Sequence, residues 1–188
     1  LLARTGALYH DIGKMKEAEF FIENQSNGFN PHDGMEFDKS AGKIIDHVTG
    51  GVQIAKKNNL PEPIIDFIRM HHGTTTVQYF YRNFVKQHPD KENEIERFQY
   101  PGPRPLTKET AILMMADTIE AASRSLKDVN NDSISDLVEK LVGQQMEEHQ
   151  FEDADMTFKE IRQVKEVFKR KLRDIYHARI AYPEKAKK

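Results

Sequence analysis

The sequence predicts an all-α domain built as a bundle of helices. Apolar residues recur at helical spacing along almost the whole chain, and runs that alternate apolar with polar residues, as strands do, are nearly absent. The composition, 38% hydrophobic and 31% charged over 188 residues, suits one compact globular domain. We therefore expect residues 1–188 to form a single helical domain.

The apolar periodicity predicts seven helices. Their expected ranges are 1–12, 37–58, 61–72, 75–87, 107–127, 132–149 and 157–180. Pro61 and Pro63 fit the first turn of the third helix, where a missing N–H group costs little. The glycines of "TGG" at 49–51 predict a weak point in the second helix, because each glycine costs about 1 kcal/mol relative to alanine.

The later helices carry capping residues, and two long loops interrupt the series. Thr107 with Thr110, and Ser133 with Asp132, are expected as N-terminal caps. Two segments rich in turn-forming residues, 23–36 and 89–106, are predicted as loops, and a long ordered loop in a helical domain is more often functional than accidental. The last helix is amphipathic with a basic face, and we expect it to pack on the bundle rather than to bind a membrane.

The composition excludes several classes of function. The chain has no cysteine, so a metal can be held only by His, Asp, Glu or backbone oxygen. The formal net charge of −2 gives no overall positive field, and we expect neither DNA nor RNA as a partner. The apolar run "AILMMA" is too short to cross a bilayer. The chain begins without Met and shows no signal-peptide pattern, so we expect it to be part of a longer protein.

A histidine and an aspartate stand side by side in "ALYHDIGKM" at residues 7–15, and other histidines supply this pair with partners. Of the eight histidines, His10, His47, His71 and His72 lie at or near helix ends or on core-facing helical positions. The other four lie in loops or on polar faces, where we expect no metal; they are His32, His88, His149 and His177.

Asp117 adds a carboxylate inside the apolar stretch "MMADTIEAA", where an aspartate is costly unless it is paired or coordinates a cation. With Asp11 it completes a series of His-Asp, His, His-His and Asp on different expected helices, and facing helices of a bundle build metal sites in this way. Imidazole and carboxylate without thiolate suit iron, manganese, zinc or cobalt. Asp11 could bridge two metals about 3.5–4 Å apart, an arrangement that activates water.

The motifs "HDIGK" at 10–14 and "MHHGT" at 70–74 resemble those of the HD-domain metal-dependent phosphohydrolases. Longer stretches, among them "ENQSNGFNPHDGM" and "FQYPGPRPLTKETAILMMADTIEAASRSL", are similar to the cytoplasmic HD domain of bacterial seven-transmembrane-receptor HD proteins. The resemblance runs from residue 1 to about residue 180 and implies the HD-domain helical bundle.

This resemblance also implies a reaction, since members of that group hydrolyse cyclic di-AMP to the linear dinucleotide pApA. It implies two divalent transition metals, iron or manganese, with Asp11 bridging them. The implied ligands are His10, Asp11, His47, His71, His72 and Asp117. The family's first metal histidine lies on a helix upstream of this chain, so one metal is expected to bind more weakly here. A glycine-tyrosine-proline signature does not follow the paired histidines, which argues against cyclic di-GMP.

Further side chains are expected around the metals, each with an ordinary alternative. Lys14 is expected to neutralise a phosphate oxygen in catalysis, or else to be a solvated lysine. Arg124, two helical turns after Asp117, is expected to contact the second phosphate or to form an ion pair. Substrate binding is further assigned to the segment after the paired histidines, which also suits a plain turn; it comprises Gly73, Thr74 and Thr75. Tyr100 and other aromatic residues could stack on a base or belong to the core.

Two alternatives to this reaction stay open at the level of sequence. One is an HD hydrolase of mononucleotides or of the alarmone ppGpp, although such enzymes use a simpler set of one His, one His-Asp pair and one Asp. The other is a sensor that binds a cyclic dinucleotide without cleaving it. The resemblance further implies a membrane tether outside this chain and a place at the cytoplasmic face of the bacterial cell membrane, while a homodimer is left open.

Overall fold

The computed structural model describes residues 1–25 and 30–177, and its regular elements there are all helices, as the sequence predicts. The α-helices are α1 (Leu2–Tyr9), α2 (Phe37–Lys57), α3 (Glu62–Met70), α4 (Gln78–Gln87), α5 (Lys108–Ser123), α6 (Asn131–Glu147) and α7 (Phe158–His177). Four 3-10 segments lie between them: η1 (Ile12–Lys16), η2 (Ala18–Phe20), η3 (Ile22–Asn24) and η4 (Pro89–Phe98).

Each predicted helix has a counterpart in the structure, but the end of the first helix and the start of the predicted loop 89–106 differ from the prediction. α1 ends at Tyr9, and Asp11, with φ −98° and ψ 13°, turns the chain into η1. The predicted loop 89–106 begins as the 3-10 segment η4, because Phe98 at its end is fully buried and holds the segment against α4. Residues 178–180 of the predicted last helix, and 26–29 of the predicted loop 23–36, lie outside the described residues.

The two predicted caps differ in accuracy. Thr107 caps α5 as expected, since its side chain accepts from the backbone N–H of Thr110 while the Thr110 side chain accepts from that of Thr107. For α6 the predicted cap is wrong by two or three positions, because Asn130 is the capping residue. Its side-chain oxygen accepts from the backbone N–H groups of Asp132 and Ser133, and the Ser133 hydroxyl accepts in return from the Asn130 N–H.

The glycines of α2 do not weaken the helix as predicted, because they allow neighbouring backbones to approach it. Gly51 is buried within regular helix, and a Cβ atom there would lie 2.8 Å from Cγ2 of Ile68 on α3. On the other side, a Cβ on Gly13 of η1 would lie 1.8 Å from the backbone oxygen of His47. The close packing of η1, α2 and α3 therefore offsets the lower helix propensity of these glycines.

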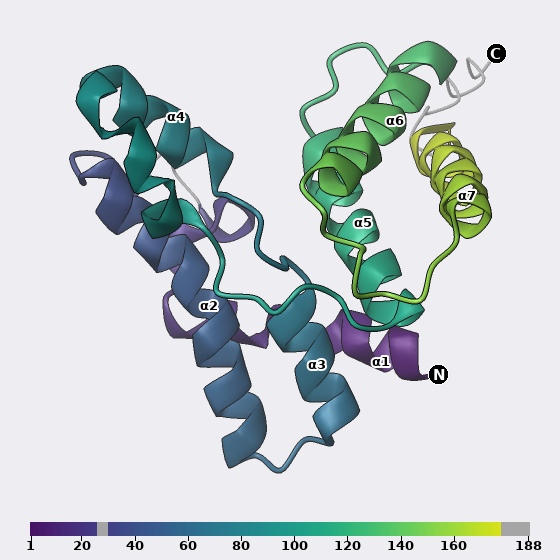
Figure 1. Ribbon diagram of the computed structural model, residues 1–188, viewed down its shortest axis with the longest axis horizontal. Coiled ribbons are helices and arrows are strands. Elements are labelled where there is room, and N and C mark those ends of the chain that lie inside the picture. The colour runs from purple at the N-terminus through teal and green to yellow at the C-terminus, as the bar shows by residue number, and fades with distance from the viewer. Residues whose placement is uncertain (26–29, 178–188) are drawn as a thin grey trace, which may run out of the picture.

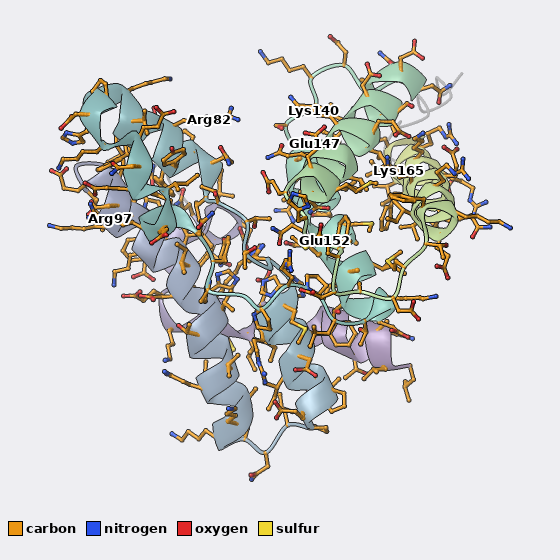
Figure 2. The ribbon with its side chains drawn as sticks, in the orientation of Figure 1. Arg82, Arg97, Lys140, Glu147, Glu152 and Lys165 are labelled. Carbon is orange, nitrogen blue, oxygen red and sulfur yellow. The ribbon has the colours of Figure 1, made fainter. Side chains whose placement is uncertain are left out.

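The molecule has two parts with α1 between them (Figure 1). Helices α2, α3 and α4 lie on one side and α5, α6 and α7 on the other, while α1 contacts both α3 and α5. The chain crosses between the parts in the connection from η4 to α5 (Figure 1), where Arg104 is paired with Glu152 and Asp153 of the segment after α6. Glu152 is labelled at this place in Figure 2.

The larger apolar core belongs to α5, α6 and α7. Its buried members include Met115 and Ile119 of α5, Ile134 of α6, and Ile161 and Leu172 of α7. Helix α7 thus packs its apolar side on the bundle as predicted, and its Lys165 (Figure 2) lies 2.9 Å from a carboxylate oxygen of α6. Within residues 1–25 and 30–177, no helix combines the length and the apolarity needed to cross a membrane.

Candidate metal centre

Six side chains that are distant in sequence meet where the end of α1, the middle of α2, the end of α3 and α5 come together. They are His10, Asp11, His47, His71, His72 and Asp117, the residues predicted as ligands. Two overlapping groups among them have ligand atoms within 4.8 Å of one another, namely His47 with His71 and His72, and His10 with Asp11 and His71.

Asp11 belongs to the second group and also faces the first, because its two oxygens point toward different nitrogen atoms. Its Oδ1 is 3.5 Å from Nε2 of His47 and 3.6 Å from Nε2 of His71. Its Oδ2 is 3.2 Å from Nε2 of His10 and 2.8 Å from Nζ of Lys14. A carboxylate whose two oxygens face different sets of donors is placed as a bridging ligand would be.

Asp117 joins the same centre from the opposite part of the molecule. Its Oδ1 lies 3.5 Å from Nε2 of His10, and its Oδ2 lies 4.0 Å from Nδ1 of His72. The carboxylate is partly buried on α5, a helix whose other side belongs to the large apolar core. The centre thus draws ligand candidates from both parts of the fold.

Three of the four histidines are oriented in the same way. In each, Nδ1 donates a hydrogen bond to the backbone carbonyl three residues earlier, which leaves the Nε2 lone pair facing the centre. The pairs are His10 with Ala7 at 2.9 Å, His47 with Ile44 at 2.5 Å, and His71 with Ile68 at 2.8 Å. This arrangement is the one by which proteins fix the tautomer and ring direction of a metal-binding histidine.

The Nε2 atoms that face the centre lack suitable hydrogen-bond donors among the side chains around them. Nε2 of His47 lies 3.0 Å from Nε2 of His71, and with both Nδ1 atoms donating, two neutral rings would turn their lone pairs toward one another. Nε2 of His10 is buried without a hydrogen-bond partner of good geometry among the described residues. A cation between these atoms would satisfy all of them, so the donor set of imidazole and carboxylate fits divalent transition metals.

The pKa values differ between the carboxylate side and the histidine side of the centre. Burial disfavours charge on His10, but the carboxylates of Asp11 and Asp117 outweigh it and raise the pKa of His10 to about 10. Burial also disfavours the charged form of Asp11, yet its contacts with His10 and His71 hold the pKa of Asp11 well below its usual value. Deeper in the site, burial and then the charge of His71 lower the pKa of His47 to about 4. One proton thus occupies the carboxylate side of the centre, where a metal would replace it.

Glycines bring the ligand-bearing segments together, and sequence reasoning missed this role. A Cβ on Gly6 of α1 would lie 2.3 Å from the ring of Phe67, so Gly6 lets α1 approach α3 and brings His10 toward its partners. Gly13 does the same for η1 and α2 next to His47. The signal available in the sequence was a glycine two residues after the His-Asp pair, which predicts a close backbone approach.

Tyr100 is a further residue of the centre, whereas the sequence offered it only for stacking on a base or for the core. Its ring is buried and stacks on His72, with 4.2 Å between ring centroids and 21° between ring planes. It also meets His47 edge-on at 6.1 Å. Burial first, and then the charges of Asp117 and Asp11, raise the pKa of Tyr100 above its ordinary value. Tyr100 therefore belongs to the wall of the metal centre, where it stays neutral.

A cavity of about 470 Å³ opens next to the carboxylates. Its walls include Asp11, Asp117, Lys14 and Arg124, together with Ile22. The volume lies in the range of small-molecule sites, which runs from about 300 to 1,000 Å³. Two cations therefore line one cavity beside the two carboxylates of the centre.

Both cations already have carboxylate partners. Nζ of Lys14 lies 2.7 Å from Glu23 as well as close to Asp11, and Arg124 is paired with Glu120 of the preceding helical turn at 2.8 Å. Lys14 is thus not a solvated lysine, and the predicted ion pair of Arg124 is present.

The turn after the paired histidines does not line this cavity. Its backbone donors are occupied, since the N–H of Gly73 donates to Met70 and that of Thr74 to the side chain of Gln150. The N–H of Thr75 donates to the carbonyl of His72. The geometry therefore favours the alternative of a structural turn over the predicted substrate donors.

Comparisons with known proteins identify the family of this chain. The family model of the HD domain matches residues 1–122. The chain is 42% identical over 188 residues to the cyclic-di-AMP phosphodiesterase PgpH of Bacillus subtilis, and 40% identical over 185 residues to the PgpH of Listeria monocytogenes. It covers 26% and 25% of these relatives, so it spans about a quarter of their length.

Solved structures show the same fold. The HD domain of L. monocytogenes PgpH in complex with cyclic-di-AMP superposes with a TM-score of 0.90 at 38% identity, over 94% of this chain and 81% of that one. The same domain in a second crystal structure gives a TM-score of 0.87, over 94% and 82% of the two chains. The resemblance inferred from the motifs is thereby confirmed.

Proposed function

Because the chain belongs to the HD-domain family, we propose that it is a metal-dependent phosphodiesterase that hydrolyses cyclic di-AMP to pApA. The observation that carries the proposal is the position of Asp11 at the edge of a cavity lined by Lys14 and Arg124. One of its oxygens faces His47 and His71, and the other faces His10. A bridging carboxylate beside two cations suits attack on one phosphate of a substrate that has two.

The ligand candidates divide into two overlapping sets around Asp11. His47, His71 and His72 with Asp11 would hold one divalent metal, and His10, Asp11 and Asp117 would hold the other. Iron or manganese is proposed for both, because imidazole and carboxylate ligands without thiolate suit these ions. When bound, such a pair supplies a hydroxide at neutral pH and neutralises charge on the phosphate.

The two cations of the cavity would bind the phosphates. Lys14 is held at the edge of the centre by Asp11 and Glu23, so a phosphate oxygen reaching the metals would meet its ammonium group and displace Glu23. Arg124 extends from the end of α5 into the same cavity, where its planar guanidinium can bind the second phosphate in bidentate fashion. Neither residue needs to transfer a proton in this scheme.

The choice of cyclic di-AMP follows from the relatives, which are named for this activity, and from the related domain crystallised with this ligand. The one-metal mononucleotide or ppGpp alternative is less well supported, because His47, His71 and His72 add three imidazoles to the set that such enzymes use. A non-catalytic sensor would have no need of metal ligands at every one of these six positions.

The setting of the domain is also a proposal. We infer that the longer protein holds this domain at the cytoplasmic face of a bacterial cell membrane through segments outside the chain. A homodimer would form through α7 or through the segment "YPGP" at 100–103, and measuring the oligomeric state in solution would test this.

The test is product analysis by chromatography. The purified chain, loaded with Mn²⁺ or with Fe²⁺ under anaerobic conditions, is incubated with cyclic di-AMP or cyclic di-GMP, and its metal content is measured in parallel. We expect pApA from cyclic di-AMP, and no product from the Asp11→Asn variant, which keeps the side-chain shape but loses the charge. Protein that holds two metal ions per chain and cleaves neither dinucleotide would rule out the proposal.

A further inference from the structure

His72 differs from the other three histidines of the centre in how its ring is held. The rings of His10, His47 and His71 are each fixed by a hydrogen bond from Nδ1 to a backbone carbonyl. For His72 the structure of residues 1–25 and 30–177 shows no such bond, and Nδ1 instead faces Asp117. Another contact has to orient this ring, because a metal ligand that rotates freely binds more weakly.

The ring of His71 lies near His72, with 4.1 Å between centroids, but it is tilted by 44°. The contact that stacks on His72 is the ring of Tyr100. The two rings are nearly parallel, 21° apart, with centroids at 4.2 Å, and only 8% of Tyr100 is exposed to solvent. A stacked neighbour restricts rotation of the imidazole about its last side-chain bond, which is the freedom that a hydrogen bond to Nδ1 would otherwise remove.

Tyr100 is itself fixed relative to His72 by the backbone. The N–H of Tyr100 donates to the carbonyl of Thr75 at 2.9 Å, and Thr76 and Gln99 form an antiparallel bridge. Thr75 in turn donates from its hydroxyl and its N–H to the carbonyl of His72, at 2.7 and 3.1 Å. A short ladder thus ties the segment that carries the tyrosine to the turn that carries the histidine.

We propose that Tyr100 is a positioning residue of the metal centre, whose stacked ring sets the orientation of His72 in place of a hydrogen bond to the backbone. The proposal rests on the metal centre of the proposed function and adds to it the residue that orders its fourth histidine. The tyrosine hydroxyl has no part in this role, so a phenylalanine serves equally well.

The experiment compares three variants with the unaltered chain. Tyr100→Phe keeps the stacked ring, and Tyr100→Leu replaces it by an apolar side chain without a plane. Tyr81→Leu is the matched control, since Tyr81 packs on Phe98 away from the centre. Mn²⁺ affinity is measured by calorimetry, metal-free thermal stability by circular dichroism, and the orientation of His72 by crystal structures without metal.

We expect Tyr100→Phe to match the unaltered chain in all three measurements. Tyr100→Leu should lose about 10–100-fold in affinity at one metal site and show His72 turned away from Asp117. Tyr81→Leu should lower only the thermal stability. Unchanged metal affinity and an unchanged His72 ring in Tyr100→Leu would overturn the proposal.

If the unaltered chain binds no metal, the proposed function fails. The metal-free crystal structures still test the role of Tyr100, because they show whether the ring of His72 changes its orientation in Tyr100→Leu.

Discussion

The two parts of the molecule reach their packing by different means. Around the metal centre, η1, α1, α2 and α3 meet through glycines, at which a single added carbon would strike backbone or ring atoms. In α5, α6 and α7, contact is made by a continuous set of buried apolar side chains. The first kind of packing tolerates almost no change in distance, whereas the second can relax around a lost side chain. The geometry of the centre therefore depends mainly on the glycine contacts of the first part, although α5 supplies Asp117, and the largest apolar core lies in the second part.

The largest effect that this comparison predicts comes from Gly13→Ala. A Cβ there would lie 1.8 Å from the His47 oxygen and 2.7 Å from the Gly51 nitrogen, both backbone atoms that cannot move without shifting α2. Asp11 would leave its place between the histidines, so we expect metal affinity, measured by calorimetry, to fall by about 100-fold or more. Gly42→Ala on the same helix is the control, since a Cβ there meets nothing within 4 Å. Equal metal affinities of both variants would contradict the role of close backbone packing.

The opposite pattern is expected for Ile134→Ala in the apolar core. Ile134 is 2% exposed on α6, so its truncation should lower the free energy of unfolding by about 2–5 kcal/mol. Metal affinity should stay within about twofold, because the residue is outside the centre. Denaturant unfolding and calorimetry on the same sample give both values. Ile175→Ala, at a position 47% exposed on α7, is the control with little effect on stability. A large loss of metal affinity in Ile134→Ala would contradict the claim that the apolar core affects stability but not the metal centre.

Arg124→Gln tests a residue that extends from the end of α5, in the second part of the molecule, into the cavity beside the metal centre. Loss of a charged hydrogen bond to a phosphate, worth about 1.5–3 kcal/mol, should raise KM for cyclic di-AMP by roughly 10–100-fold. Metal affinity and stability should not change. Steady-state kinetics with Arg82→Gln, a variant of α4, as control would test this. A reduced metal content in Arg124→Gln would show that the arginine supports the centre instead.

The smallest effect is expected from Thr107→Ala, which removes the cap of α5. Stability should fall by about 1 kcal/mol in denaturant unfolding, while metal affinity stays the same. Thr49→Ala removes an exposed hydroxyl from the middle of α2 and serves as a control. If the weakened start of α5 lowered metal affinity, Asp117 would depend on the whole helix rather than on its packed centre.

The helices and the ligand residues could be predicted from the sequence because both leave local signals. Helical periodicity fixes α2, α5 and α7 within a few residues, and adjacent histidine and aspartate side chains are visible without a fold. The residues that support the ligands leave weaker signals, such as the glycine two residues after the His-Asp pair. Gly6 and Gly13 look like ordinary helix breakers until their partners are known, and Tyr100 meets His72 only after the chain has folded back. The cap at Asn130 was missed because Asp132 and Ser133 are equally good capping residues by type.

The hydrogen bonds that orient His10, His47 and His71 have a consequence for how the protein is assembled. Each bond spans only three residues, within or at the end of one helix. The ring directions can therefore be established as soon as each helix forms, which takes microseconds or less in isolated peptides. When the helices pack together, only the distances between them remain to be set, because three of the four imidazole rings already have their final orientation within their own helices. Much of the entropy cost of ordering these ligands is met during local folding, before an ion enters.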